Sequence, residues 1–190
     1  MRHLKSTFVL RLAAGVLLVC AALAAGAARA SAEGVRFEPA GGGFSVMFPA
    51  TPEKRSEQEN LGAFVLSISG YGLDHEGVGY FVVHFSLPPQ AMSEPRMEEF
   101  LYTRMETEYA MLGKAAGGDV FSVAERSDIT LGEFKGRQCV YNGSKAMGVV
   151  RGYKVGQRFY IVGVFGNKES FSAQRAVAFL DSFKLTGKNT

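Results

Sequence analysis

The sequence predicts an α+β domain in which a mainly antiparallel β-sheet packs against two amphipathic helices. Two observations lead to this fold class. Short apolar-rich segments of period two follow one another after residue 32 and are separated by glycine-containing turns, as is typical of strands. Two other segments repeat their hydrophobic residues at helical spacing instead. A chain of 190 residues is long enough for one such domain and an appendage.

Four strands are expected before the first helix. The polar segment 54–60 predicts a loop between the second and third strand. The glycine-rich segment 70–78 predicts an exposed turn or mobile loop between the third and fourth. The strand at 79–87 is apolar on both of its faces, so it needs cover on both sides of the sheet. The expected strands are residues 35–38, 43–48, 63–69 and 79–87.

Helical spacing predicts one helix between a cap at Ser93 and a stop at Gly113, and a second at about 171–182. Between them four segments predict a meander, in which Gly156-Gln157 suits a two-residue hairpin turn. Residues 183–185 are expected to close the sheet after the last helix. The strands of the meander are residues 121–131, 133–141, 146–155 and 158–165.

The first 32 residues have the pattern of a secretory signal peptide. A basic segment at 1–11 precedes an uncharged apolar run at 12–28, and small residues allow cleavage after Ala30 or Ala32. The remaining residues, 33–190, then form a single globular domain. Two alternatives stay open, an uncleaved membrane anchor and a lipoprotein signal in which Cys20 is lipidated. A membrane is an expected partner only in those two cases.

The charge of the chain gives no indication of nucleic-acid binding. It contains 21 Lys and Arg residues against 18 Asp and Glu residues. Four of the basic residues belong to the first 30 positions, which hold no acid, so the remainder has 17 basic and 18 acidic residues. Without an excess of positive charge there is no basic surface for phosphate contacts, and nucleic acid is not expected as a partner.

Cys139 and His84 both have an ordinary structural interpretation. Cys139 lies in a strand-like segment without a nearby His, so we expect a buried and unreactive thiol. His84 lies within a hydrophobic strand and is expected to be a core or face histidine with a satisfied ring nitrogen. The alternative is a thiol enzyme or hydrolase whose site would gather His75, His84, Cys139 and acidic residues through folding.

Asp74, His75 and Glu76 are the candidate binding residues. They form the most polar cluster of the glycine-rich segment, although successive residues seldom converge on one ion. We therefore expect no metal site and no cofactor, and the common hydrolase, nucleotide and zinc motifs do not occur in the sequence. The segment Asn142-Gly143-Ser144 has the form of a glycosylation site but is interpreted as a turn.

Three short segments resemble the PsbP-like proteins, which share an α/β/α sandwich with the Mog-type proteins. They are Gly43-Phe44-Ser45-Val46-Met47-Phe48-Pro49 with Thr51-Pro52, Arg158-Phe159-Tyr160-Ile161-Val162, and Phe179-Leu180-Asp181-Ser182-Phe183-Lys184. The resemblance covers almost all of residues 33–190. It implies a central antiparallel sheet with helices on both faces, and an accessory or binding role without a shared catalytic centre.

Together these observations predict an extracytoplasmic protein, periplasmic or secreted, that serves as a non-catalytic accessory or binding module of the bacterial cell envelope. Its partner is expected to be an envelope protein or a small ligand. A noncanonical hydrolase and a protein tethered by its uncleaved leader are the alternatives. We expect binding at the loop 70–78 first and at the segment 87–93 second, because loops held by a rigid sheet are common recognition sites.

Overall fold

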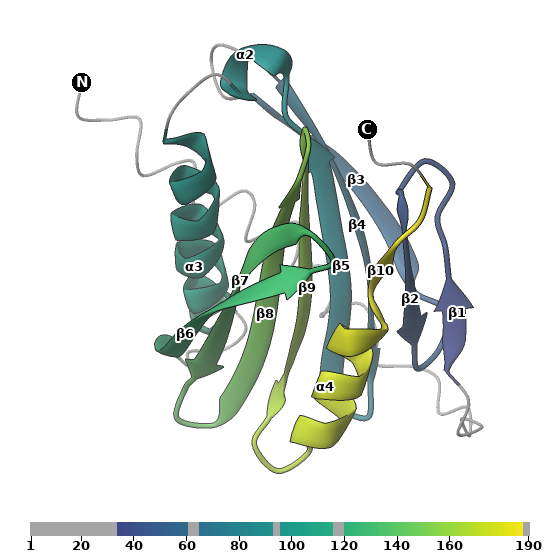
Figure 1. Ribbon diagram of the computed structural model, residues 1–190. Coiled ribbons are helices and arrows are strands. Elements are labelled where there is room, and N and C mark those ends of the chain that lie inside the picture. The colour runs from purple at the N-terminus through teal and green to yellow at the C-terminus, as the bar shows by residue number, and fades with distance from the viewer. Residues whose placement is uncertain (1–33, 61–64, 93–95, 116–119, 188–190) are drawn as a thin grey trace.

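Among the residues that the computed structural model describes, seven antiparallel strands form the main sheet, in the order β3-β4-β5-β9-β8-β7-β6 (Figure 1). The structure describes residues 34–60, 65–92, 96–115 and 120–187. The central strands β5 and β9 pair with each other from Val78–Gly166 to Ser86–Arg158. The seven strands are β3 (Glu53–Asn60), β4 (Val65–His75), β5 (Val78–Ser86), β6 (Ser122–Leu131), β7 (Phe134–Asn142), β8 (Ala146–Val155) and β9 (Arg158–Asn167).

The two faces of this sheet are covered by different elements. Helix α3 (Met97–Ala115) lies on one face. Helix α4 (Ala173–Ser182) covers the other, beside a small sheet of order β1-β2-β10 (Figure 1). A short helix, α2 (Pro89–Met92), follows β5. The fold is thus α+β with helices on both faces of an antiparallel sheet, as predicted. The strands of the small sheet are β1 (Val35–Phe37), β2 (Phe44–Phe48) and β10 (Lys184–Leu185).

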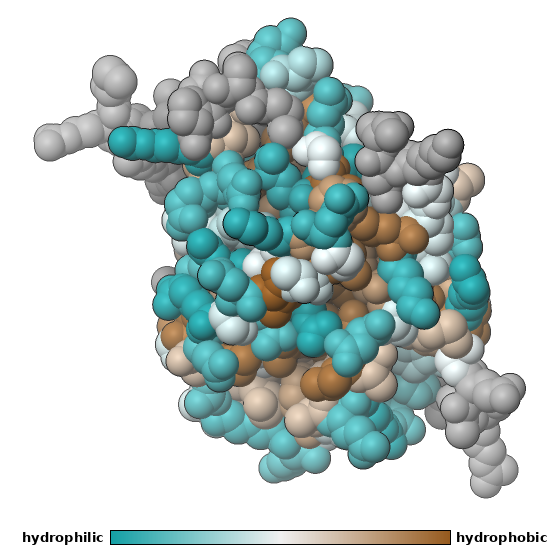
Figure 2. Space-filling model, viewed as in Figure 1, coloured by the Kyte–Doolittle hydropathy of each residue, from teal (hydrophilic) through white to brown (hydrophobic). Residues whose placement is uncertain are grey.

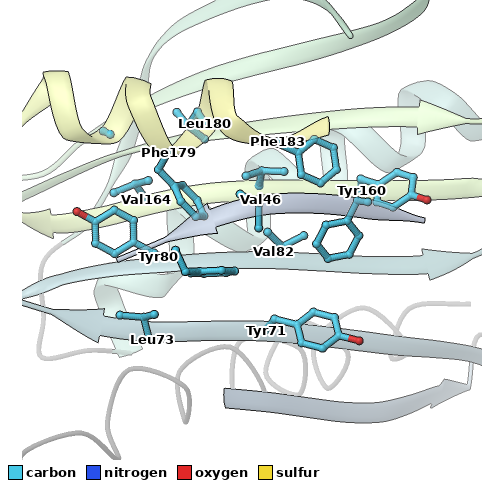
Figure 3. Packing of buried hydrophobic residues seen from close by; sticks show 14 of the residues in the cluster. Val46, Tyr71, Leu73, Tyr80, Val82, Tyr160, Val164, Phe179, Leu180 and Phe183 are labelled. Carbon is cyan, nitrogen blue, oxygen red and sulfur yellow. The ribbon is translucent and has the colours of Figure 1, made fainter. Parts of the chain in front are cut away.

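Each face of the sheet has its own hydrophobic core, because neighbouring residues of a strand point to opposite sides. On β5, Tyr80 and Val82 pack toward α4, whereas Phe81 and Val83 pack toward α3. Figure 3 shows side chains of the α4 side, which come from β2, β4, β5, β9 and α4. The prediction that the strand at 79–87 is buried on both faces is confirmed.

The segment 54–60, predicted to be a loop, is the strand β3 at the edge of the sheet. Its side chains alternate between exposed and half-buried, and the half-buried ones include the charged Arg55, Glu57 and Glu59. Polar residues suit an edge strand, which faces solvent along one side. Glu59 additionally pairs with Arg104 of α3, so its carboxylate has a partner beneath the helix.

The segment 70–78, predicted to be a loop, is also mostly strand. β4 continues to His75, and only Glu76 and Gly77 form the turn to β5, with φ angles of 55° and 76°. Pairing on both sides, with β3 and β5, outweighs the low strand propensity of its glycines. The φ angles above zero match a two-residue hairpin turn. Residues 70–75 are therefore held in the sheet.

The remaining predicted elements are the meander, the two helices and the strand after the last helix. The meander is confirmed as β6 to β9, with a turn at Gly156 (φ 55°) and Gln157. Both helices are confirmed, but α3 continues through Gly113, the predicted stop, to Ala115. The hydroxyl of Ser172 caps α4 by accepting from the N–H of Arg175 at 3.3 Å. Residues 184–185 pair with β2 in the small sheet, which corrects the prediction that they extend the main sheet.

Residues 1–32 and Ser93 lie outside the described residues, so the signal peptide, a lipidated Cys20 and the predicted helix cap stay predictions. No helix among the described ranges has the length and apolar character needed to cross a membrane. Figure 2 shows a surface on which hydrophilic residues prevail in this view and hydrophobic ones occur in small groups between them.

Candidate functional site

The structure does not bring the side chains of Asp74, His75 and Glu76 together. Asp74 and His75 end β4 and point to opposite faces of the sheet, as successive strand residues do. Glu76 lies in the turn, where its carboxylate accepts from Arg175 of α4 at 2.6 Å. This hydrogen bond lowers the pKa of Glu76. A binding role for the three residues stays a prediction.

The residues named for a hydrolase are also separated. Cys139 is fully buried on the α3 face, where burial raises the pKa of its thiol to about 11. This confirms the prediction that the thiol is buried, and the raised pKa agrees with the low reactivity expected for it. His84 packs on the opposite face, against Phe44, Tyr71 and Tyr160. His75 lies at the other end of the β4–β5 hairpin from His84. The alternative site therefore does not assemble.

An open cleft of about 1170 Å³ lies at the end of the sheet opposite to the Glu76 turn. Its walls come from the β1–β2 turn, the β8–β9 turn, the residues that follow β5, and the segment after β10. The cleft thus joins segments from both ends of the described chain. Its lining includes Gly41, Ser86, Pro89, Gln157, Arg158 and Thr186.

Arg158 is the cationic residue of the cleft, and hydrogen bonds of one guanidinium nitrogen, Nη1, hold its side chain in place. Its Nη1 donates to the carbonyl of Gly42 at 3.0 Å and to the Tyr160 hydroxyl at 3.4 Å. The Tyr160 hydroxyl also donates to this carbonyl, at 3.0 Å. Glycine is required at position 42, because a Cβ there would lie 2.7 Å from Cγ of Pro39. The hydrogen bonds of Arg158 and Tyr160 therefore connect the β1–β2 turn to β9.

Arg158 differs from most arginines of the described residues in having no carboxylate partner among them. Its Nε and Nη2 atoms have no partner in the described ranges, and the side chain is half-buried. The arginines that do pair with a carboxylate are Arg36, Arg55, Arg104, Arg126, Arg137, Arg151 and Arg175.

His84 lies next to this cleft on the same face of β5 as Ser86, which lines it. Its Nε2 is buried and has no hydrogen-bond partner among the described residues, which corrects the prediction of a satisfied ring nitrogen. Burial first, and then the charges of Arg158 and Lys54, lower the pKa of His84 to about 4. The ring is therefore neutral at pH 7. Figure 3 shows the hydroxyls of Tyr71 and Tyr160 pointing to one end of the packed side chains, opposite to that of Tyr80.

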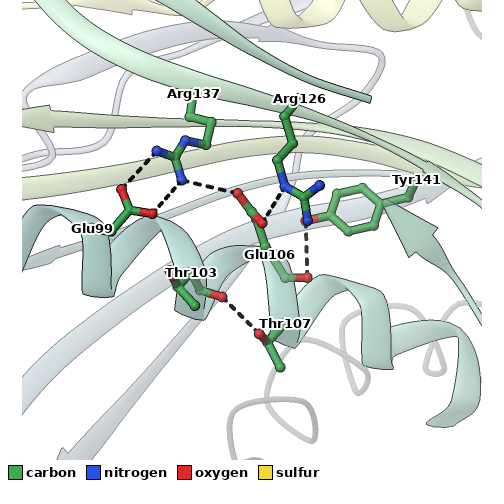
Figure 4. A network of polar contacts seen from close by, with 7 residues as sticks. All are labelled: Glu99, Thr103, Glu106, Thr107, Arg126, Arg137 and Tyr141. Carbon is green, nitrogen blue, oxygen red and sulfur yellow. Dashed lines mark hydrogen bonds and ion pairs between the residues drawn. The ribbon is translucent and has the colours of Figure 1, made fainter. Parts of the chain in front are cut away.

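A second polar region fastens α3 to the far edge of the sheet (Figure 4). Arg137 of β7 binds Glu99 at 2.9 Å and Glu106 at 3.2 Å, and its guanidinium lies 4.7 Å from the centre of the Tyr102 ring. Arg126 of β6 binds Glu106 at 2.7 Å. Each charged group in this network has an opposite charge beside it. Arg126, Arg137, Glu99 and Glu106 thus form a structural clamp between α3 and the strands β6 and β7.

A third group of charges lies between α3 and β3. Arg104 binds Glu59 at 2.6 Å and Glu108 at 2.5 Å, and all three side chains are nearly buried. Burial raises the pKa of Glu108 to about 7 despite the nearby guanidinium. It also raises the pKa of Glu57, which the charge of Glu59 raises further. We call Arg104, Glu59 and Glu108 the Arg104 cluster.

Sequence reasoning missed the cleft, although it named the segment 87–93, part of which borders it. The only local signal is an arginine that opens the apolar strand at 158–165. The partner of Arg158 is Gly42, which is 116 residues away in the chain, so no local pattern could connect them.

Comparisons with known proteins agree on the fold. No family model matches the sequence, and no curated protein matches it. Among solved structures, the chain is similar to the cyanobacterial PsbP (CyanoP) of Synechocystis sp. PCC 6803, with a TM-score of 0.55 and 10% identity. The match covers 86% of this chain and 98% of that one. At this identity the likeness shows the fold alone, and the chain therefore has a PsbP-like fold.

Proposed function

We propose that this protein is an exported, non-catalytic accessory protein of the cell envelope that binds its ligand or partner in the cleft beside Arg158. The observation that carries the proposal is the cleft itself. Its walls come mainly from turns, and two of its lining residues, Ser86 and Arg158, stand at the ends of the central strands β5 and β9. Binding residues are commonly placed on loops that a rigid scaffold positions.

The chemistry of the cleft favours binding over catalysis. Its polar groups are an anchored guanidinium, the Glu38 carboxylate, which pairs with Arg36, hydroxyls, an amide and backbone groups of glycine-rich turns. The neutral ring of His84 has Nε2 enclosed, and Cys139 is buried on the other face of the sheet. A PsbP-like fold is consistent with an accessory role, although fold alone does not determine function. Export is supported by the signal-peptide pattern of residues 1–32.

Site-directed photocrosslinking tests where the protein binds. A p-benzoylphenylalanine residue placed at Ser86 reports on the cleft, and the same residue at Asp74 reports on the turn at the other end of the sheet. Both positions are exposed. After irradiation of cells, we expect an adduct at position 86 and its loss when the cleft residue Gln157 is changed to Trp. The mass of the adduct distinguishes a protein partner from a small ligand.

The same experiment decides between the cleft and the predicted Asp74-His75-Glu76 site. An adduct at position 74 alone would reject the cleft and support the turn as the binding site. Adducts at neither position would reject both. Control variants with the crosslinker at exposed Glu125 of β6 show the background, because β6 lies at the far edge of the sheet.

Export is tested separately by cell fractionation and by the mass of the mature N-terminus. We expect the soluble extracytoplasmic fraction to contain a chain that begins at Ser31 or Glu33. An intact Met1 in the membrane fraction would favour the tethered alternative. A lipid on Cys20 would show that the protein is a lipoprotein.

A further inference from the structure

We infer that the cleft is a carboxylate-binding site, in which the free edge of the Arg158 guanidinium binds the anionic group of a small organic acid. This inference rests on the proposed function, because it specifies what the cleft binds. Nothing in the fold comparison assigns a ligand to this place. Four observations lead to it, and each concerns a different part of the cleft.

The first observation is the geometry of the guanidinium. Nη1 is occupied by Gly42 and Tyr160, whereas Nε and Nη2 have no partner among the described residues. Nε–H and one Nη2–H lie parallel along one edge of the planar group, which is the spacing of the two oxygens of a carboxylate. The anchored Nη1 orients this edge before any ligand arrives, so little side-chain entropy is lost on binding.

The second observation is the charge around the cleft. Arg158 and Lys54 both act on His84 as positive charges, so the local field at this end of the sheet favours an anion. Glu38 is the acidic residue of the lining, and Arg36 pairs with it at 3.2 Å. The guanidinium of Arg158 carries one positive charge that no carboxylate of the described residues neutralises. A carboxylate ligand brings one negative charge to match it, whereas a phosphate dianion brings two.

The third observation is the set of hydrogen-bonding groups beside Arg158. Ser86 pairs with Arg158 across β5 and β9, so the two side chains leave the same face of the sheet next to each other. The hydroxyl of Ser86 is exposed in the cleft and can donate to a carboxylate oxygen. Thr186 lines the cleft as well and offers a further hydroxyl. The anion thus meets donors from more than one strand.

The fourth observation is the apolar part of the lining, which indicates the rest of the ligand. Pro39, Pro89 and Val155 line the cleft together with the glycines of two turns. Its volume of about 1170 Å³ exceeds the size needed for an inorganic ion alone. A carboxylate with an attached hydrocarbon chain fits both parts of this lining.

Hexanoate is a suitable probe, with hexanol and hexyl phosphate as matched compounds. Titrations of the 15N-labelled domain are followed through the Nε–H signal of Arg158 and the backbone signals of residues 38–43 and 155–158. We expect hexanoate to shift both sets of signals, with a Kd in about the millimolar range, as one charge-assisted pair gives. Hexanol, which lacks the charge, is expected to leave the Nε–H signal unchanged.

Arg158→Gln is expected to weaken hexanoate binding about tenfold or more, and Arg158→Lys by less, because lysine keeps the charge but not the paired donors. Arg175→Gln is the matched control, since Arg175 lies near the opposite end of the sheet. The Tyr160 hydroxyl still donates to Gly42 in the Arg158 variants, so the turn keeps a donor. The signal of Arg158 in the unchanged protein remains a readout even if a variant does not fold.

Three results would overturn the inference. Equal binding of hexanoate and hexanol would show that only the hydrocarbon chain is recognised. Tighter binding of hexyl phosphate would replace carboxylate with phosphate as the ligand class. No shift with any of the three compounds at up to about 20 mM would remove the anion site. A crosslink at position 86 would still support the cleft as the binding place, so failure of this inference is distinguishable from failure of the proposed function.

Discussion

The two faces of the main sheet are held to their helices by a different balance of ion pairs and aromatic packing. On the α3 face, ion pairs reach both edges of the sheet, through Glu59 on β3 and through Arg126 and Arg137 on β6 and β7. On the α4 face, aromatic rings pack the cover onto the sheet, and the ion pairs of α4, Arg151–Asp181 and Glu76–Arg175, have carboxylates that are more than half exposed. The arginines of the first face pair with carboxylates, whereas Arg158, where the cover of the second face ends, has no carboxylate partner among the described residues.

This difference explains why the cleft lies on the α4 side. Ion pairs along the length of α3 keep that helix on the sheet from one edge to the other. The small sheet and α4 meet the main sheet through a central group of rings, and α4 adds one ion pair near each of its ends. An open space remains beside Ser86 and Arg158. The predictions below test whether the two faces differ in this way.

The largest effect is expected from the aromatic side. Phe44 is fully buried and contacts the rings of Tyr71, Tyr160 and Phe183. Phe44→Ala should reduce the free energy of unfolding by about 3–5 kcal/mol, measured by urea denaturation, because it removes a large buried ring and leaves a cavity. Phe100→Ala is the matched control, since the Phe100 side chain is exposed on α3. A loss below about 1.5 kcal/mol would contradict the packing described for this face.

On the α3 side, the Arg104 cluster should contribute more than the exposed end of the clamp. Arg104→Met leaves Glu59 and Glu108 without their partner, and both side chains are nearly buried. We expect a loss of about 3 kcal/mol in the free energy of unfolding at pH 8, because an unpaired buried charge is costly. Arg126→Met, at an exposed side chain, should cost much less. Equal losses would mean that burial does not distinguish the two sets of ion pairs.

The pH dependence of stability tests the same cluster without breaking it. The pKa of Glu108 is raised to about 7, so the folded protein holds this proton more tightly than the unfolded chain does. The resulting stabilisation is present below pH 4.5 and is lost as the pH rises through about 7. Glu108→Gln removes the titrating group, so between pH 5 and 8 we expect its stability to gain about 1–3 kcal/mol relative to the unchanged protein.

The measurement is urea denaturation of both proteins at several pH values in this window. Glu57, whose pKa is also raised, leaves a small slope in the variant. Parallel curves for the two proteins would show that Glu108 is ionised throughout and that the guanidinium of Arg104 outweighs its burial.

Sequence reasoning predicted those elements in which the pattern of apolar residues itself indicates the buried face. Alternating or continuous apolar residues identified β5 and β9, and helical spacing identified α3 and α4. β3 was missed because seven successive polar residues show no apolar face. Its charged residues become compatible with the sheet only through Arg104, which is 45 residues from Glu59 and cannot be matched to it by local pattern.

The candidate site was less accessible to sequence reasoning than the fold. The polar triplet at 74–76 attracts attention because its residues are adjacent, yet a strand sends adjacent side chains to opposite faces. The cleft residues are scattered from Glu38 to Gly187 and meet only through folding. Their chemistry depends on an arginine left without a carboxylate, which is a property of the assembled structure.

The smallest effect is expected at the turn that the sequence singled out. The Glu76–Arg175 pair is exposed on both sides, so solvent screens it, and such pairs contribute little. Glu76→Gln should therefore change the Tm by less than about 2 °C in a calorimetric scan. It should also leave any adduct at position 86 unchanged, because the turn lies at the opposite end of β5 from Ser86. A larger fall in Tm would show that this ion pair, like the Arg104 cluster, holds its helix on the sheet, and the two faces would then differ less than their packing indicates.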